Sequence, residues 1–278
     1  MRYLSFLLFL LIFSSSCRHV ISDNYSPKYT SKQLQERLEK YYKENSTDSL
    51  RSFLNEWNKI LTPVTNEFIQ QDDAIENIYQ VMIDLYKPFK FGDYQADNYF
   101  KGKNEFIIIQ KDIDYAVVSS KEYQSFIKAA LKGYPYDTVY EYYKTKRLNI
   151  FRPKLSIDSV KYLYLTKEYE KALTDFLGTE HHELGEGDIM NTAYPKNETA
   201  NRYHFLCPIL PIVYGHWGGY WHIETFPIIY KIVFDDFFKH AFVDFRSSVG
   251  QTVIQYELIK KDGKWKSDYN KIAKIRQE

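Results

Sequence analysis

The sequence predicts an α+β fold, in which amphipathic helices come first and a β-meander comes last. Helical patterns occupy residues 30–88, and β-rich runs separated by turn residues occupy residues 226–270. With 44% hydrophobic and 26% charged residues, the chain has enough apolar surface to bury a large core. We therefore expect a single domain over residues 30–278, with N-terminal helices packed on a mixed or antiparallel sheet.

Local signals define the helices of the N-terminal part. Thr30 and Gln33 have the spacing of a capping box, which predicts the start of the first helix. A second helix is expected from near Thr47, with apolar residues on one face until Pro63 ends it. The same spacing of apolar residues predicts a third helix over residues 72–87.

Residues 100–178 mix helical and strand patterns. Runs of β-branched and aromatic residues predict strands at 106–109, 113–118 (joined to the first near Lys111 and Asp112), 149–153 and 160–165. Ser120 is placed to cap a helix through Leu131. Thr166 is placed to cap another helix, which Gly178 closes with a left-handed backbone.

The C-terminal part alternates between β-rich runs and turns. Strands are expected at 227–235, 239–246, 252–260 and 264–269. The pair Asp262 and Gly263 is the strongest hairpin signal among the turns. Residues 179–225 carry no strong period, so we expect them to be rich in loops.

The charge balance argues against one class of partner. Lys and Arg total 37 and Asp and Glu total 36, so the formal charge is only +1. Binding to nucleic acid needs a surplus of basic residues on one face, and we therefore expect no nucleic-acid partner.

The first sixteen residues have the pattern of an export signal. One basic residue, Arg2, precedes an apolar run that is shorter than the ~20 residues of a membrane-spanning helix. Residues 14–16 are serines that directly precede Cys17, and this resembles the lipobox of bacterial lipoproteins. The resemblance implies cleavage before Cys17, lipid chains on its sulfur and amine, and a tether over residues 17–29. An ordinary signal peptide cut elsewhere in the serine run is the alternative.

A lipidated Cys17 would make membrane lipid a partner and place the protein in the cell envelope, on the outer membrane. The chain lacks the acidic run that often follows the lipid cysteine in surface-exported lipoproteins, so a periplasm-facing anchor is preferred over surface exposure. Cys207 is then the one remaining thiol, and its apolar neighbours predict a buried side chain that forms no disulfide.

Histidine is concentrated in the loop-rich part of the chain. Five of seven fall within it, close to several acidic residues: His181, His182, His204, His216 and His222, with Glu183, Glu186, Asp188 and Glu224. Imidazole and carboxylate are ligands of catalytic zinc, and His216, His222 and Glu224 are the metal candidates. The spacing matches no standard metal signature, so we expect no cofactor, with zinc as the alternative. The simpler interpretation is hydrogen bonding within the loops.

Aromatic residues accompany the same loop. Trp217, Tyr220 and Trp221 stand among glycines and can form a platform for a flat apolar ligand face, such as a sugar ring. Glu183 and Glu224 would then be candidates for the two carboxylates of a glycosidase. In a chain with 18% aromatic residues, packing at the end of the core is the simpler interpretation of these rings.

Three segments together resemble uncharacterised lipoproteins of the Bacteroidota: residues 149–153, the helix entry and end at 163–178, and Gly215-His216-Trp217-Gly218-Gly219-Tyr220-Trp221-His222. The final strands, from Tyr256-Glu257 to Asp262-Gly263-Lys264-Trp265, are faintly similar to the end of NTF2-like domains. The first resemblance implies an envelope location and no activity. We expect a ligand-binding or interaction module for an unknown small molecule, glycan or protein. The alternative is a His- and Glu-dependent hydrolase, with or without zinc, that acts on an envelope or glycan substrate.

Overall fold

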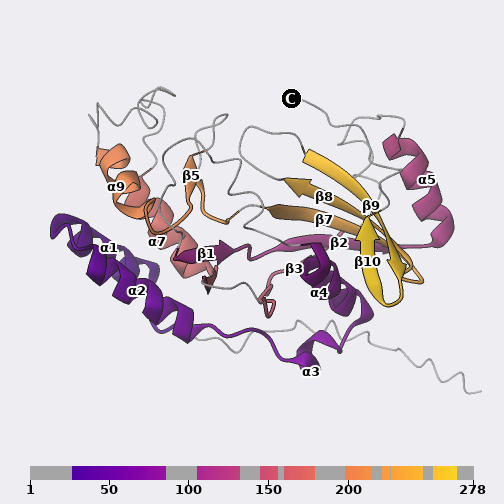
Figure 1. Ribbon diagram of the computed structural model, residues 1–278, viewed down its shortest axis with the longest axis horizontal. Coiled ribbons are helices and arrows are strands. Elements are labelled where there is room, and N and C mark those ends of the chain that lie inside the picture. Colours follow the sequence, from indigo (N-terminus) through magenta and orange to yellow (C-terminus); the bar gives the residue numbers. More distant parts are fainter. Residues whose placement is uncertain are drawn as a thin grey trace, which may run out of the picture.

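A computed structural model shows how these elements are arranged (Figure 1). It describes residues 27–85, 105–131, 145–155, 160–178, 198–214, 221–225, 227–246 and 253–267. Seven helices and ten strands lie within these ranges, which confirms the α+β class. None of the helices in these ranges has the length and apolar character needed to cross a bilayer.

The N-terminal helices form as predicted. They are α1 (Ser31–Lys43), α2 (Thr47–Ile60) and α4 (Asp73–Leu85). Both hydrogen bonds of the capping box between Thr30 and Gln33 are present. The sequence patterns missed one short helix, α3 (Asn66–Ile69), which Thr65 caps.

The strands belong to separate sheets. Strand β1 (Phe106–Ile109) pairs in parallel with β4 (Lys161–Tyr164). Strand β2 (Ile113–Val118) lies in a six-stranded sheet of order β10-β9-β8-β7-β2-β3. The two strands at 106–109 and 113–118 are therefore confirmed, but they enter different sheets.

The predicted C-terminal meander is confirmed. Its strands are β7 (Ile228–Asp235), β8 (His240–Arg246), β9 (Val253–Lys261) and β10 (Lys264–Ser267), each antiparallel to the next. Asp262 and Gly263 both have positive φ in the last turn, as an Asp-Gly hairpin requires.

The strand prediction for residues 149–153 is wrong, because the strand β3 is at Lys146–Leu148 instead. The predicted segment makes isolated hydrogen bonds rather than a ladder. The Phe151 N–H donates to the Lys111 carbonyl at 3.2 Å, and the Arg152 N–H donates to the Tyr79 hydroxyl at 3.1 Å. The segment is an irregular connection, and its buried Phe151 packs in the main core.

Helix α5 (Ser120–Leu131) begins where expected, but its cap lies one residue earlier. The Ser119 hydroxyl accepts a hydrogen bond from the Glu122 N–H, and the Ser119 N–H donates to the Glu122 carboxylate. Ser120 instead joins the helix to the β7–β8 turn, because its N–H and hydroxyl both donate to Asp236.

Helix α7 (Lys167–Leu177) has Thr166 as its N-cap and Gly178 as its C-cap, as predicted. The φ of Gly178 is 88°, a conformation that disfavours side chains with a Cβ. The predicted loop-rich part also contains α9 (Glu198–Leu206) and a small hairpin of β5 (Val213–Tyr214) and β6 (Trp221–His222). Helices α1, α2, α7 and α9 gather around β1 and β4 at one end of the molecule (Figure 1).

Helix α2 covers the edge of β4 that faces away from β1. The Trp57 indole N–H donates to the Tyr164 carbonyl at 3.0 Å, and the Asn58 amide donates to the Tyr162 carbonyl at 2.7 Å. Trp57 also stacks on Tyr169 of α7, with ring centroids 3.9 Å apart. Side chains of α2 thus satisfy carbonyls that a free sheet edge would leave open.

One buried side chain joins the two sheets. The Gln110 carbonyl oxygen accepts a hydrogen bond from the Ile229 N–H, and its amide donates to the Ile229 carbonyl, both at 2.8 Å. The same amide donates to the Asp112 carbonyl at 2.8 Å. Gln110 therefore acts as an extra strand residue, opposite the point where the pairing of β7 with β8 shifts register near Ile229.

The two faces of the six-stranded sheet differ. One face packs against the main core, to which Ile232, Phe234 and Val243 contribute together with α4. The other face has a small apolar cluster with α5, formed by Ala116, Val118, Tyr123, Phe126, Ile127, Val233 and Phe242. We refer to this second side as the α5 face.

Replacing Gln110 tests the link between the sheets. Gln110→Leu keeps the volume but leaves the Ile229 N–H and carbonyl buried without their partner, so we expect it to lower the free energy of unfolding by about 3 kcal/mol. Urea denaturation measures the loss. The matched substitution Gln124→Leu, at an exposed position of α5, is expected to change stability by at most about 0.5 kcal/mol. Equal effects of the two substitutions would contradict the proposed role of Gln110.

Candidate functional site

Many residues predicted to form a site lie outside the described ranges: Cys17, His181, His182, Glu183, Glu186, Asp188, His216, Trp217 and Tyr220. His204, Trp221, His222 and Glu224 are described. Within the described part of the chain, no three histidine, cysteine or acidic side chains are grouped as metal ligands. The zinc site of His216, His222 and Glu224 thus stays a prediction.

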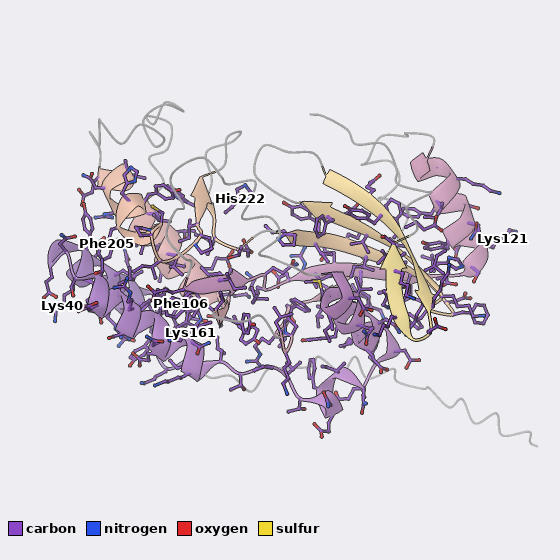
Figure 2. The ribbon with its side chains drawn as sticks, viewed as in Figure 1. Lys40, Phe106, Lys121, Lys161, Phe205 and His222 are labelled. Atoms are coloured by element: carbon purple, nitrogen blue, oxygen red, sulfur yellow. The ribbon has the colours of Figure 1, made fainter. Side chains whose placement is uncertain are left out.

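Trp221 packs as a core residue. Only 8% of it is exposed, and its ring stacks on Tyr203 of α9 with centroids 5.6 Å apart. Its indole N–H donates to the Gly178 carbonyl at 3.1 Å. The packing interpretation therefore fits this ring better than a ligand platform. His222, on the β5–β6 hairpin, is also buried (Figure 2).

His204 does not join a catalytic group in the described residues. It lies on α9 beside Tyr203, and burial lowers the pKa of its imidazole. Cys207, which follows this helix, is buried as predicted. Burial raises the pKa of its thiol to about 11, so the thiolate needed of a nucleophile is scarce at neutral pH.

The segment after β6 lies along the edge of β1 opposite β4. The Thr225 N–H donates to the Ile108 carbonyl at 2.8 Å, and the Ile108 N–H donates to the Thr225 hydroxyl at 2.9 Å. These two bonds place Glu224 near the C-terminal end of β1. Lys111 and Asp112 follow that end directly.

Four ionisable side chains lie near this end: Lys111, Asp112, Glu170 of α7 and Glu224. We call this group the Lys111 centre. The Lys111 ammonium donates to the Glu170 carboxylate at 2.5 Å and lies 3.6 Å from the nearer oxygen of Asp112. The other Asp112 oxygen is buried and has no hydrogen-bond partner. Glu224 interacts electrostatically with the other three members.

Burial and charge shift the pKa values of two members of the Lys111 centre. Burial raises the pKa of Glu224, and the charges of Glu170 and Asp112 raise it further, against the opposing effects of a backbone hydrogen bond and of the Lys111 charge. For Lys111, burial lowers the pKa, but the hydrogen bond to Glu170 and the acidic neighbours outweigh it, so the net shift is upward. A carboxyl group that holds its proton to a higher pH than usual therefore lies beside a lysine that holds its charge to a higher pH than usual.

Such a group can donate and accept hydrogen bonds at one place. The ammonium of Lys111 donates, and the carboxyl oxygens of Glu170 and Asp112 accept. The Glu224 carboxyl, whose pKa is raised, donates when it holds its proton and accepts when it does not. The solvent reaches the group, since the Lys111 side chain is 17% exposed and the Glu170 side chain 38%. Perturbed pKa values in a partly exposed group of this kind are typical of functional sites.

Sequence reasoning found Glu224 but missed Lys111, Asp112 and Glu170. The contact between Lys111 and Glu170 joins residues 59 positions apart, and no local period signals such a contact. The one local hint is that Lys111 and Asp112 stand between two strand-like runs, where polar residues tend to lie at a sheet end.

Comparison with known proteins adds no assignment: no protein family, curated protein or solved structure matches the chain.

The raised pKa of Glu224 predicts a pH dependence of stability. The folded protein holds this proton to a higher pH than the unfolded chain does, so the free energy of unfolding falls as the pH rises from 4.5 through the raised pKa. Glu224→Gln removes that loss. We expect its stability advantage over the wild type to be absent below pH 4.5 and to grow towards neutral pH in urea denaturation.

The exposed Glu36 of α1 provides the control, because its replacement by glutamine removes a carboxylate of the same type from the surface. Glu36→Gln is expected to show a small difference from wild type that is the same at each pH. A pH-independent effect of Glu224→Gln would contradict the burial argument.

Proposed function

We propose that the chain is a ligand-binding or interaction module of the cell envelope, attached to the outer membrane through lipid on Cys17 and facing the periplasm. The Lys111 centre is the observation that carries the binding part of this proposal. The resemblance of residues 14–17 to a lipobox carries the anchor.

The start of the folded domain supports a short tether. Lys28, Tyr29 and Arg37 all bond to the Glu56 carboxylate, at 2.8, 2.7 and 2.7 Å. The bonds from Lys28, Tyr29 and Arg37 lower the pKa of Glu56 to about 2 against the opposing effect of burial. The chain is thus fixed to α2 from Lys28 onward, before the predicted tether ends. A stretch of the length of residues 18–27 spans at most about 35 Å when fully extended, which would hold the domain close to the membrane.

The chemistry of the Lys111 centre favours a ligand rich in hydroxyl groups. A hydroxyl both donates and accepts, and the centre offers acceptors and donors side by side. A purely anionic ligand would face three acidic side chains, and a purely cationic one would face the Lys111 ammonium. Glycans of the envelope carry many hydroxyls, so they are the ligand class that we propose.

One observation favours a second function, a hydrolase. Glu224 has a raised pKa and interacts with a second carboxyl group, Glu170, and such pairs divide the roles of acid and base in glycoside hydrolysis. In this alternative Glu224 donates the proton to the leaving group. A zinc ion on His216, His222 and Glu224 would make a separate form of the hydrolase, in which Glu224 is an ionised metal ligand and not the acid.

The two cysteines allow a matched test of the anchor. Cys17→Ala removes the lipid attachment site, so we expect the protein to leave the membrane fraction and the detergent phase of a phase partition. Cys207→Ala changes a buried thiol and is expected to stay membrane-bound. A Cys17→Ala protein that still partitions with membranes would contradict the anchor.

Binding of glycans tests the Lys111 centre. We expect the full-length protein in detergent to bind envelope glycans on an array, and Lys111→Met to weaken the binding about tenfold, or by about 1.4 kcal/mol. The exposed Lys121 of α5 is the control, and Lys121→Met should bind as the wild type does.

The same glycans separate the two functions. A binding module leaves its ligand intact, and mass spectrometry then finds no cleavage products. A hydrolase cleaves it, and Glu224→Gln abolishes the cleavage while the binding remains. Equal binding by wild type and Lys111→Met would place the ligand elsewhere.

A further inference from the structure

Two turns and the start of a helix meet at one end of the six-stranded sheet. Strand β7 is parallel to β2 and antiparallel to β8, which is antiparallel to β9, so β2, β7 and β9 run in the same direction. The β7–β8 turn, the β9–β10 turn and the start of α5 therefore lie at the same end. Ser120 of α5 donates two hydrogen bonds to Asp236 of the β7–β8 turn. We call this region the turn end of the sheet.

The turn end exposes an aromatic ring. Phe237 is 67% exposed, more than any other large hydrophobic residue among those described. Its turn is closed by the Asp235 carboxylate, which accepts hydrogen bonds from the two backbone N–H groups that follow Phe238, at 2.7 and 2.8 Å. Phe238 packs against the main core with a φ of 49°, a costly conformation for a bulky residue. A fixed turn thus places one phenylalanine on the core and the other in solvent.

Basic side chains accompany the exposed ring. Five lysines at the turn end are exposed: Lys121, Lys239, Lys261, Lys264 and Lys266. Their ammonium groups make no hydrogen bond or ion pair in the described part of the chain. The Lys239 ammonium lies 5.8 Å from the centroid of the Phe237 ring. Trp265 packs in the main core, so its neighbours Lys264 and Lys266 point to the α5 face.

Like charges face each other across the last hairpin. Lys261 pairs directly with Lys264, and such an arrangement destabilises a strand pair unless an anion lies nearby. The exposed acids at this end, Glu122, Asp236 and Asp262, are three against five lysines. The turn end is therefore positively charged.

Protection of a sheet edge explains only part of this pattern. Lysines commonly keep an edge strand from pairing with another chain, and β10 is an edge strand. That role does not account for Lys121 of α5 or for Lys239 of the β7–β8 turn. It does not account for an exposed Phe237 either, because an apolar ring favours association.

We propose that the turn end binds the surface of the membrane, with Phe237 among the lipid headgroups and the lysines against the phosphates of anionic lipids. Aromatic and basic side chains together are typical of contacts at the membrane surface. The closed turn already presents the ring, so binding orders little of the chain. The lysines give the contact its preference for anionic lipids, and salt weakens it.

This inference rests on the proposed envelope location and adds an orientation to it. Figure 2 shows Lys121 of α5 at the opposite end of the molecule from Lys40 of α1. Helix α2, to which the start of the domain is bonded, lies beside α1 (Figure 1). The anchor and the turn end would thus fix the domain on the membrane at two places. A single weak contact is reversible, so the turn end orients the domain and does not replace the lipid on Cys17.

Quenching by brominated lipids tests the contact. The lipidated full-length protein is placed in vesicles of brominated phosphatidylcholine and phosphatidylglycerol at low salt. Phe237→Trp keeps an aromatic ring at the turn and makes its position measurable, because bromine atoms on the acyl chains quench only indoles that reach the bilayer. We expect the emission that this variant adds over wild type to be quenched, and to recover as the salt concentration rises.

Tyr230→Trp is the matched control. Tyr230 is 38% exposed but lies near the start of β7, away from the turn end. Its new indole should therefore stay unquenched in the same vesicles. Both substitutions replace one exposed ring by another, so we expect both variants to melt as wild type does.

A lysine pair tests the role of charge. Each basic residue near an anionic surface contributes about 1 kcal/mol, so Lys261→Gln with Lys264→Gln, added to Phe237→Trp, should lower the ratio of docked to undocked protein about 30-fold. The quenched fraction measures this ratio. Lys32→Gln with Lys43→Gln removes the same charge from exposed positions of α1 and should leave the ratio unchanged.

Four results would overturn the proposal. Protein that floats with the vesicles while the Phe237→Trp indole stays unquenched would keep the anchor and remove this contact. Protein that does not float at low salt would contradict the anchor and the contact together. Equal quenching in vesicles of phosphatidylcholine alone would contradict the role of the lysines. An emission change without vesicles that grows with protein concentration would assign the turn end to a second copy of the chain.

Discussion

Two hydrogen bonds between the Gln110 side chain and the Ile229 backbone hold the two-stranded sheet against the six-stranded sheet. Strand β1 has β4 on one side, and on the other it meets the segment ending at Thr225. In the described residues no backbone ladder joins the two-stranded sheet to β7, so the Gln110 side chain supplies the hydrogen bonds between them. Because Lys111 and Asp112 follow Gln110 directly, the same side chain sets where the Lys111 centre lies.

Aromatic residues make up 18% of the chain, and the hydrogen bonds of their hydroxyl and indole groups explain part of this high content. Several buried rings donate to backbone carbonyls far away in sequence: Trp57 to Tyr164, Tyr79 to Ile150, Tyr164 to Pro153 and Trp221 to Gly178. Each such ring buries a large apolar area and also satisfies a carbonyl at a sheet edge, a helix end or an irregular connection. The described residues contain no disulfide, and these contacts tie distant segments together instead.

Local chemistry was predictable from the sequence, and long-range pairing was not. Thr30, Thr166 and Gly178 act as caps, and Asp262-Gly263 turns the last hairpin, because each needs only its neighbours. In contrast, the hydrogen bonds of Gln110 to Ile229 join residues 119 positions apart in the sequence. Strands β1 and β4 pair in parallel, so no hairpin turn between them marks the pairing in the sequence. The prediction of a strand at 149–153 was wrong for the same reason. A β-rich segment forms a strand only if a neighbouring strand pairs with its backbone, and the sequence does not show that partner.

The candidate site was also predictable only in part from the sequence. Glu224 stood out because it lies among histidines and aromatic residues, but Lys111 and Glu170 reach it only through the fold. Trp221, which the same pattern offered as a ligand platform, has its ring face against Tyr203. A residue type and its neighbours indicate chemistry, whereas burial decides which side chains are open to a ligand.

Native-state hydrogen exchange at the Ile229 amide tests whether Gln110 holds the two sheets together. This N–H donates to a side chain rather than to a neighbouring strand. If Gln110 joins the sheets, the amide exchanges only on global unfolding, with the same free energy of opening as the slowest amides of β1 and β8. Fast exchange at Ile229 that does not depend on denaturant, beside slow exchange in both strands, would show that the two sheets separate without unfolding and would contradict the account.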